Sequence, residues 1–191
     1  MTARSRSIFT IAVTLALAAP IFATSTASAR ENEHQIGLDV GASMLKVDDK
    51  STLSFGGGAG AHYVYGLNDT FNLLAEGSAS LVSLKEDRES YTPLTRPISV
   101  SHLAAGVAYT LDVMTWVPYF GVLAGGFVLG GGTLDHTLVL PGGQLALGLD
   151  YKLSHHWAVG VAYRQTMFLV KTSTYPSYSN FFARFEYAWG W

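Results

Sequence analysis

Seven charged side chains are conspicuous because of where they fall in the sequence. Charged residues make up 14% of the chain, against about 25% in an ordinary soluble domain. Seven occupy the polar positions of segments in which apolar residues alternate: Asp39, Glu76, Asp150, Lys152, Arg164, Arg184 and Glu186. Buried charges persist only when they are paired and hydrogen-bonded. The sequence therefore predicts an internal network of ion pairs. Two alternatives stay open, namely a gate that re-pairs Arg164 or Arg184, and a catalytic role for the Glu76 carboxylate.

The histidines suggest a metal site at first, but their spacing does not support one. His155 and His156 are adjacent in a turn, which favours a solvated turn over shared ligation. His62 is expected to face inward and to hydrogen-bond to Glu76, whereas His102 lies at a different level of its strand. No third ligand has suitable spacing, so we predict no metal and no cofactor. Ser101 and His102 point to opposite faces of a strand, so a nucleophile–base pair is not expected and the chain is not predicted to be an enzyme.

The elements that position these residues are strands. Apolar and polar residues alternate with a period of two, which places successive side chains on opposite faces of a strand. The pattern, which includes the terminal stretch RFEYAWGW, covers residues 36–44, 53–65, 71–82, 103–111, 116–132, 144–152, 157–167 and 184–191. Residues 116–132 are a strand by composition, but both faces are apolar and the pattern alone does not fix the register.

The connections between the strands alternate in length. Short turns fall at residues 67–70, 112–115 and 154–156. Longer connections fall at residues 85–97, 130–143 and 171–179. Transmembrane barrels have short periplasmic turns and longer extracellular loops. The sequence thus predicts an all-β fold, an eight-stranded antiparallel up-and-down transmembrane β-barrel over residues 30–191, with both ends of the barrel chain on the short-turn side.

The N-terminus has the layout of an export signal. Arg4 and Arg6 precede an apolar run over residues 8–23, and the small-residue stretch 27–29 follows. This is typical of a signal peptide, and we expect cleavage after residue 29. The run is shorter than the roughly 20 residues of a membrane-spanning helix. There is no cysteine and the net charge is −2, so neither a disulfide framework nor a nucleic-acid partner is expected.

The side chains on the two faces distinguish a membrane barrel from a soluble one. The polar face consists mainly of small residues, which suit the narrow interior of an eight-stranded barrel. Large aromatic residues gather beside the short turns, as at a membrane interface. We expect this periplasmic aromatic girdle to contain Tyr63, Tyr65, Trp116, Tyr151, Trp157, Tyr187, Trp189 and Trp191. The predicted location is the outer membrane of a diderm bacterium, in contact with its lipid and lipopolysaccharide.

Residues 30–191 resemble the small eight-stranded family of the OmpA transmembrane domain and OmpX. The resemblance rests on the alternation, the strand number, the stretch VPYFGVLAGG and the terminal strand. It implies an interior ionic network and recognition of the last strand by the barrel-assembly machinery, although Trp191 stands where such proteins usually end in Phe. Some enzymes that modify lipid A share this fold, but their His-x-Ser-Asn motif is absent.

The preferred interpretation is a small integral barrel with a structural or surface-interaction role and a lumen plugged by side chains. A narrow passive channel for ions or small solutes is the alternative, and a lipid A-modifying enzyme is the third. The long loops KEDRESYTPLTRP and KTSTYPSYSN are rich in polar and aromatic residues. Such loops on a rigid barrel can bind an extracellular partner.

Overall fold

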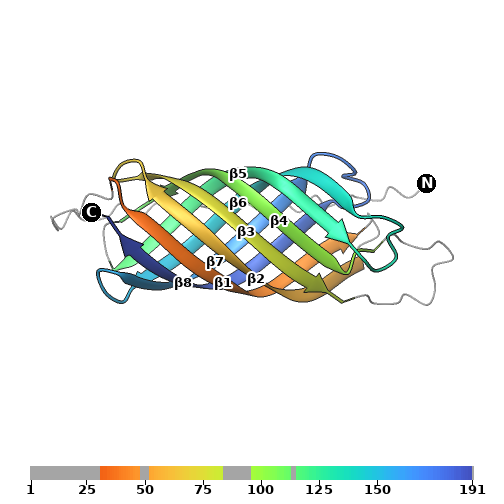
Figure 1. The fold of residues 1–191 in the computed structure, drawn as a ribbon, viewed down its shortest axis with the longest axis horizontal. Coiled ribbons are helices and arrows are strands. Elements are labelled where there is room, and N and C mark those ends of the chain that lie inside the picture. Colours follow the sequence, from red (N-terminus) through yellow and green to blue (C-terminus); the bar gives the residue numbers. More distant parts are fainter. Residues whose placement is uncertain (1–30, 48–51, 84–95, 113–114, 191) are drawn as a thin grey trace, which may run out of the picture.

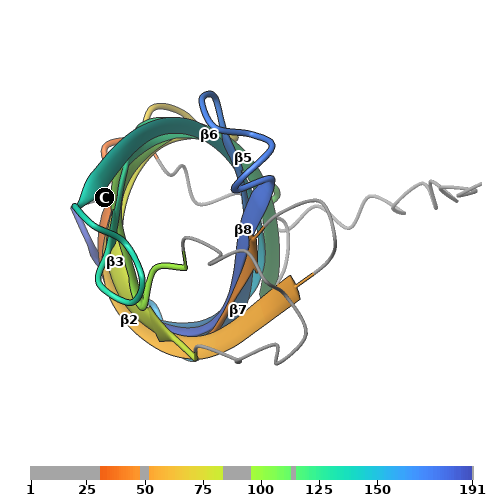
Figure 2. The ribbon, with the colours of Figure 1, turned by 90° about the vertical axis from the view of Figure 1, so that its right-hand side faces the viewer.

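The protein is a closed barrel of eight antiparallel strands. The computed structural model describes residues 31–47, 52–83, 96–112 and 115–190. Each strand pairs with its neighbours in sequence, and β1 closes the ring against β8 (Figures 1 and 2). The strands are β1 (His34–Val47), β2 (Thr52–Gly66), β3 (Phe71–Val82), β4 (Ser99–Thr110), β5 (Trp116–Gly130), β6 (Leu138–Lys152), β7 (Trp157–Phe168) and β8 (Ser177–Trp189). The predicted fold class and strand number are confirmed.

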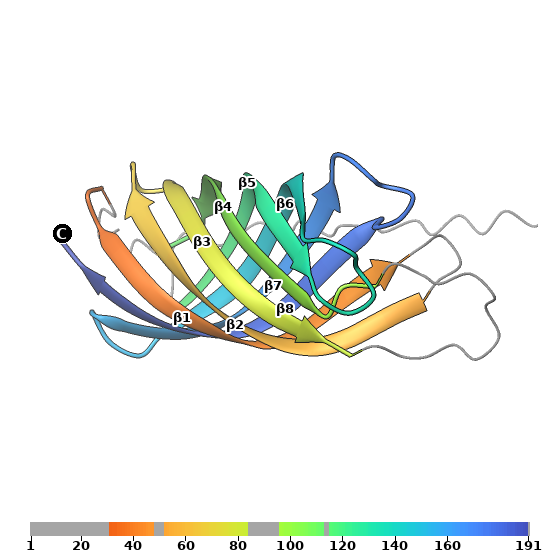
Figure 3. The same ribbon diagram turned by 45° about the vertical axis from the view of Figure 1, so that its right-hand side comes forward.

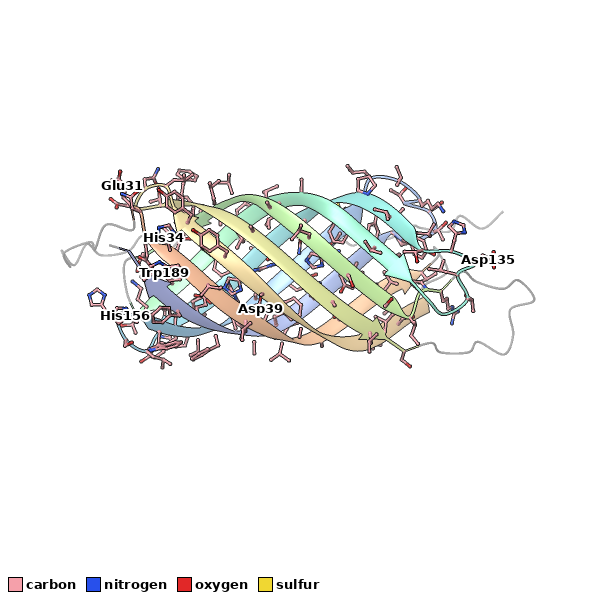
Figure 4. All side chains as sticks on the ribbon, viewed as in Figure 1. Glu31, His34, Asp39, Asp135, His156 and Trp189 are labelled. Atoms are coloured by element: carbon pink, nitrogen blue, oxygen red, sulfur yellow. The ribbon has the colours of Figure 1, made fainter. Side chains whose placement is uncertain are left out.

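The two ends of the barrel differ, as the connection lengths predict. Each strand has 12 to 15 residues, more than the 9–11 that a tilted strand needs to cross a bilayer, and the strands run obliquely to the long axis (Figure 3). Figure 4 shows Glu31, His34, His156 and Trp189 at one end and Asp135 at the opposite end. We call these the short-turn end and the loop end. Within the described residues, no helix is long and apolar enough to span a membrane.

The structure resolves the register of β5, which the sequence left open. Trp116, Phe120 and Val122 are exposed on the outer face, whereas Tyr119 and Leu123 are buried in the lumen. Phe120 is the partner of Leu147 on β6, and both side chains lie on the outside. Both faces of β5 are apolar because the lumen contains apolar layers as well as charges.

Three expected strand boundaries require correction, of which one is the start of β8, at Ser177 within the expected 171–179 loop. Residues 138–143 were expected to belong to a long loop, but they form the first part of β6, and the loop is limited to residues 131–137. Gly131 and Gly132 both have φ of 69°, a conformation that glycine adopts without steric cost. β4 also begins earlier than expected, at Ser99. Expectations for residues 1–29, for part of the 85–97 loop and for Trp191 lie outside the described residues.

The outer surface is apolar over the whole length of the strands. Leu103 is 72% exposed although it is paired on both sides, with Gly77 on β3 and Gly126 on β5. The inward positions hold glycine, alanine, polar and charged residues, with apolar side chains concentrated near the loop end. This arrangement is the inverse of a soluble barrel and fits a lipid-facing band.

Candidate functional site

The lumen contains a buried charge cluster, which begins with the pair formed by Glu76 and Arg164. Arg164 Nε donates a hydrogen bond to Glu76 Oε2 over 2.7 Å. Gln144 Nε2 donates to the other carboxylate oxygen over 2.8 Å, and His102 Nε2 lies 3.4 Å from that oxygen. All four side chains are at least 94% buried. Glu76 therefore has partners from β4, β6 and β7, which satisfy a charge that would otherwise be costly to bury.

Arg184 on β8 forms the second centre of the charge cluster. Its guanidinium lies 2.5 Å from the Glu186 carboxylate, 3.3 Å from Asp39 and 3.6 Å from Asp150. Asp39 belongs to β1 and is the Cα partner of Arg184 across the closing seam. Three carboxylates from three strands thus surround one permanent cation.

His62 links two of these carboxylates. Its Nδ1 lies 2.9 Å from Asp39 Oδ2 and its Nε2 lies 2.8 Å from Glu186 Oε1. An ionised carboxylate only accepts hydrogen bonds, and a neutral imidazole has a single N–H. Two full hydrogen bonds to ionised carboxylates therefore require the imidazolium form of His62.

The expectation that His62 pairs with Glu76 is wrong. The Cα atoms of these residues are partners across β2 and β3, but the His62 ring is directed towards β1 and β8. A glycine at position 37 permits this direction, because a Cβ there would collide with the His62 ring. The imidazole beside Glu76 is that of His102, which the sequence analysis did not include in the network.

Tyr119 connects the two centres. Its phenol oxygen accepts hydrogen bonds from Arg164 Nη1, over 3.0 Å, and from Arg184 Nη1. The two guanidinium carbons lie 5.6 and 4.8 Å from the centroid of the ring, within the range of cation–π attraction. Tyr119 was not predicted, since the register of its strand was unknown. Without this oxygen, two like charges would converge with no acceptor between them.

Glycines on neighbouring strands make room for the large polar side chains. Gly148 is the Cα partner of Tyr119, and a Cβ at position 148 would overlap the phenol ring. Gly160 is the partner of Asp150, and a Cβ there would meet the carboxylate. The narrow lumen of an eight-stranded barrel accommodates such side chains only where the opposite position is small.

Lys152 does not join the charge cluster as expected. Its ammonium lies 2.7 Å from Asp112 Oδ2, and its side chain is 37% exposed. The short-turn end holds this pair because Lys152 is the last residue of β6. The other six predicted lumen charges lie in the cluster, with contacts to at least one other member each.

An apolar layer fills the lumen at the loop end. Ten buried side chains form it: Leu45, Val47, Val82, Val100, Phe127, Leu129, Leu140, Phe168, Tyr175 and Tyr178. Phe127 packs edge-to-face on Phe168, with ring centroids 5.4 Å apart. Tyr175 comes from the loop that follows β7 and is 1% exposed, so this loop is anchored on the layer. The layer was not predicted.

The short-turn end, by contrast, is hollow. A cavity of about 380 Å³, which we call the vestibule, is lined by residues that include Glu33, Asp150, Lys152, Trp157 and Glu186. A pocket of about 20 Å³ leads from it to Tyr119 and Arg184. Within the described parts of the chain, no group of three or more His, Asp or Glu side chains is arranged to hold a metal ion.

Aromatic rings surround the outside of the same end. Trp157 packs on Tyr187, with centroids 4.8 Å apart, and Tyr187 stacks on Trp189 at 5.9 Å. Trp116 and Tyr151 form another pair at 4.7 Å. Tyr63 and Tyr65 both lie against His34, which stacks on Trp189. His34 was not predicted as part of this girdle.

The fold and the inverted surface define a class, that of small outer-membrane barrels. The model of the outer membrane protein beta-barrel domain matches residues 14–188, and the chain belongs to this family. It lies in the outer membrane. Among curated proteins, no sequence matches the chain.

Solved structures of the same fold come from several bacteria. Neisserial surface protein A is 11% identical, with a TM-score of 0.63 over 82% of this chain and 99% of that one. Ail, the attachment invasion locus protein of Yersinia pestis, is 12% identical, with a TM-score of 0.53 over 83% and 99%. OprG from Pseudomonas aeruginosa is 12% identical, with a TM-score of 0.52 over 85% and 99%. At these identities the likeness shows the fold alone.

Proposed function

We propose that this protein is a closed outer-membrane barrel with a structural or surface-interaction role. The observation that carries the proposal is the filling of the lumen in two successive zones, the charge cluster and then the apolar layer. A solute that entered from the short-turn end would have to separate Arg184 from its three carboxylates. It would then have to displace rings such as Phe127 and Phe168, both at most 2% exposed.

The energetics of these zones support a plug. Breaking one member out of a buried ion pair costs about 3–5 kcal/mol. An ion that crossed the apolar layer would also lose its hydration without replacement hydrogen bonds. The runner-up function, a narrow passive channel, needs both zones to rearrange.

The loop end is where a partner would bind. Residues 131–137 and 169–176 connect strands there, and Tyr175 holds the second loop on the apolar layer. A loop fixed in this way presents its exposed residues Thr172 and Ser173 without a large loss of conformational entropy. Among proteins of this fold, Ail has been crystallised with the heparin analogue sucrose octasulfate, which supports a surface-interaction role.

Contacts with the envelope complete the proposal. The apolar band faces lipid, with lipopolysaccharide in the outer leaflet around the loop end. Export uses residues 1–29 as a cleaved signal, and the barrel-assembly machinery reads the last strand, which carries Phe185, Tyr187 and Trp189 on its outer face.

Conductance tests the plug. The folded wild-type barrel is compared in a planar bilayer with Arg164→Ala and with Phe127→Ala, one variant for each zone. We expect no steady current from the wild type or from either single variant, because the other zone still closes the lumen. The double variant is expected to conduct. Steady openings in the wild type would contradict the plug and favour the channel.

A further inference from the structure

The vestibule is a cavity whose described lining lies at the short-turn end of the barrel. Its volume of about 380 Å³ lies in the range of small-molecule sites. The lining comes from β1 and the segment before it, from β5 to β8, and from the turn between β6 and β7. The charge cluster closes its inner end at Tyr119 and Arg184. Because short turns of outer-membrane barrels face the periplasm, we place the opening on the periplasmic side.

Acidic side chains dominate the walls. Glu33, Asp150 and Glu186 line the vestibule from three different elements. Lys152 lines it as well, but its ammonium is 2.7 Å from Asp112, so that carboxylate balances its charge. The walls therefore have a net negative charge.

The inner end reduces this charge without cancelling it. Arg184 is a permanent cation there, and Asp39 adds a further carboxylate beside it. Among the described residues, five carboxylates face two permanent cations, Lys152 and Arg184; the carboxylates are those of Glu33, Asp39, Asp112, Asp150 and Glu186. If His62 is counted as an imidazolium between Asp39 and Glu186, a net charge of −2 remains. His155 and His156 at the rim add positive charge only when protonated.

Size and donor chemistry narrow the class of ligand. The described residues hold no cluster of three metal-ligating side chains, and the cavity is much larger than a single bare ion. Carboxylates on opposite walls accept charge-assisted hydrogen bonds from N–H donors. Trp157 also belongs to the lining, at the rim, where its ring packs on Tyr187 in the outer girdle.

We propose that the vestibule binds a small organic ammonium ion from the periplasm. The negative field, focused by low-dielectric walls, concentrates such cations at the opening. The carboxylates of Glu33, Asp150 and Glu186 accept their N–H groups. This site adjoins the plug, with which it shares Asp150 and Glu186, and it does not require conduction through the barrel.

The test is a titration of the full folded barrel in zwitterionic micelles, followed by NMR. The probe is 1,4-diaminobutane, and 1,4-butanediol is the uncharged control of equal length. We expect saturable shifts of the amide signals of Glu33, Lys152 and Ala188 with the diamine and none with the diol. Added NaCl should weaken the binding, since salt screens exposed charges.

Two substitutions at the vestibule should act in opposite directions. Glu33→Gln removes one negative charge but keeps the oxygen that accepts a hydrogen bond from Gln35 Nε2. It should weaken binding of the diamine about three- to tenfold, which is the effect of removing one unit charge about 6 Å from the bound ammonium group. Lys152→Gln should strengthen binding by a similar factor. Glu31→Gln, an exposed control outside the lining, should change nothing. Equal shifts with the diol, or identical affinities for the three variants, would overturn the proposal.

Discussion

Replacing Tyr119 by phenylalanine should destabilise the barrel far more than the same replacement of a tyrosine on the outer face of the barrel. The phenol oxygen of Tyr119 is the shared acceptor for Arg164 and Arg184. Phenylalanine keeps the ring and its packing but leaves two guanidinium N–H groups directed at a carbon atom. The substitution therefore tests whether the two centres of the charge cluster depend on this bridge.

The magnitude follows from the two lost hydrogen bonds. A hydrogen bond to a charged group contributes about 1.5–3 kcal/mol. Both arginines keep their carboxylates, Glu76 on one side and Glu186 on the other, so the guanidiniums stay in place. Two such bonds sum to about 3–6 kcal/mol, and because the guanidiniums keep these partners we expect the lower end of that range, a fall of about 3–4 kcal/mol in the free energy of unfolding.

Urea unfolding in phosphocholine vesicles, followed by tryptophan fluorescence, measures this loss. Tyr163→Phe is the matched control, because Tyr163 is 37% exposed on the outside and its hydroxyl donates to Gln165, a neighbour on the same strand. The control should change stability by less than about 0.5 kcal/mol, as surface substitutions usually do. If Tyr119→Phe also lowers the free energy of unfolding by less than about 0.5 kcal/mol, the bridging role of Tyr119 is refuted.

Two further predictions concern the walls of the barrel. Gly148→Ala should lower the free energy of unfolding by about 1–3 kcal/mol, because the new methyl group overlaps the Tyr119 ring. Gly143→Ala is the control: its methyl group meets nothing within 4 Å, and it should be neutral in the same unfolding assay. Val122 lies in the middle of β5 and is 54% exposed, and its replacement by arginine should lower stability in a bilayer by about 2–4 kcal/mol. Val139→Arg, near the loop end of β6, should lower it by only about 0–1 kcal/mol. Equal losses for the two variants would contradict the assigned depth of the lipid-facing band.

Much of the fold could be predicted because one physical rule governs every strand. A strand between lipid and a narrow lumen must alternate, and this alternation is visible in seven of the eight segments, the exception being residues 116–132. The rule fails where the lumen itself is apolar. Residues 138–143 contain Pro141 and two glycines and therefore look like a turn. Leu138 and Leu140 nevertheless pack in or against the apolar layer, and this tertiary contact extends β6.

The site could be predicted only as a set of inward charges. Alternation shows that Asp39 and Arg184 point into the lumen, but it does not show which neighbouring strand an inward side chain is directed towards. His62 contacts β1 and β8 rather than its Cα partner Glu76, since strand tilt and a glycine at position 37 decide the direction. Lys152 lies at a strand end, where exposure to solvent favours a partner from the adjacent turn.

The seam between β1 and β8 has a consequence for the order of assembly. Asp39 and Arg184 are partners across this seam, yet 145 positions separate them in the sequence. Until the last strand is in place, Asp39 and His62 lack the guanidinium and carboxylate that β8 supplies. An unfinished sheet would thus expose unneutralised charge in a membrane, where it is costly. Ring closure and charge neutralisation are then a single event, and a chain truncated before β8 should fail to remain in the bilayer.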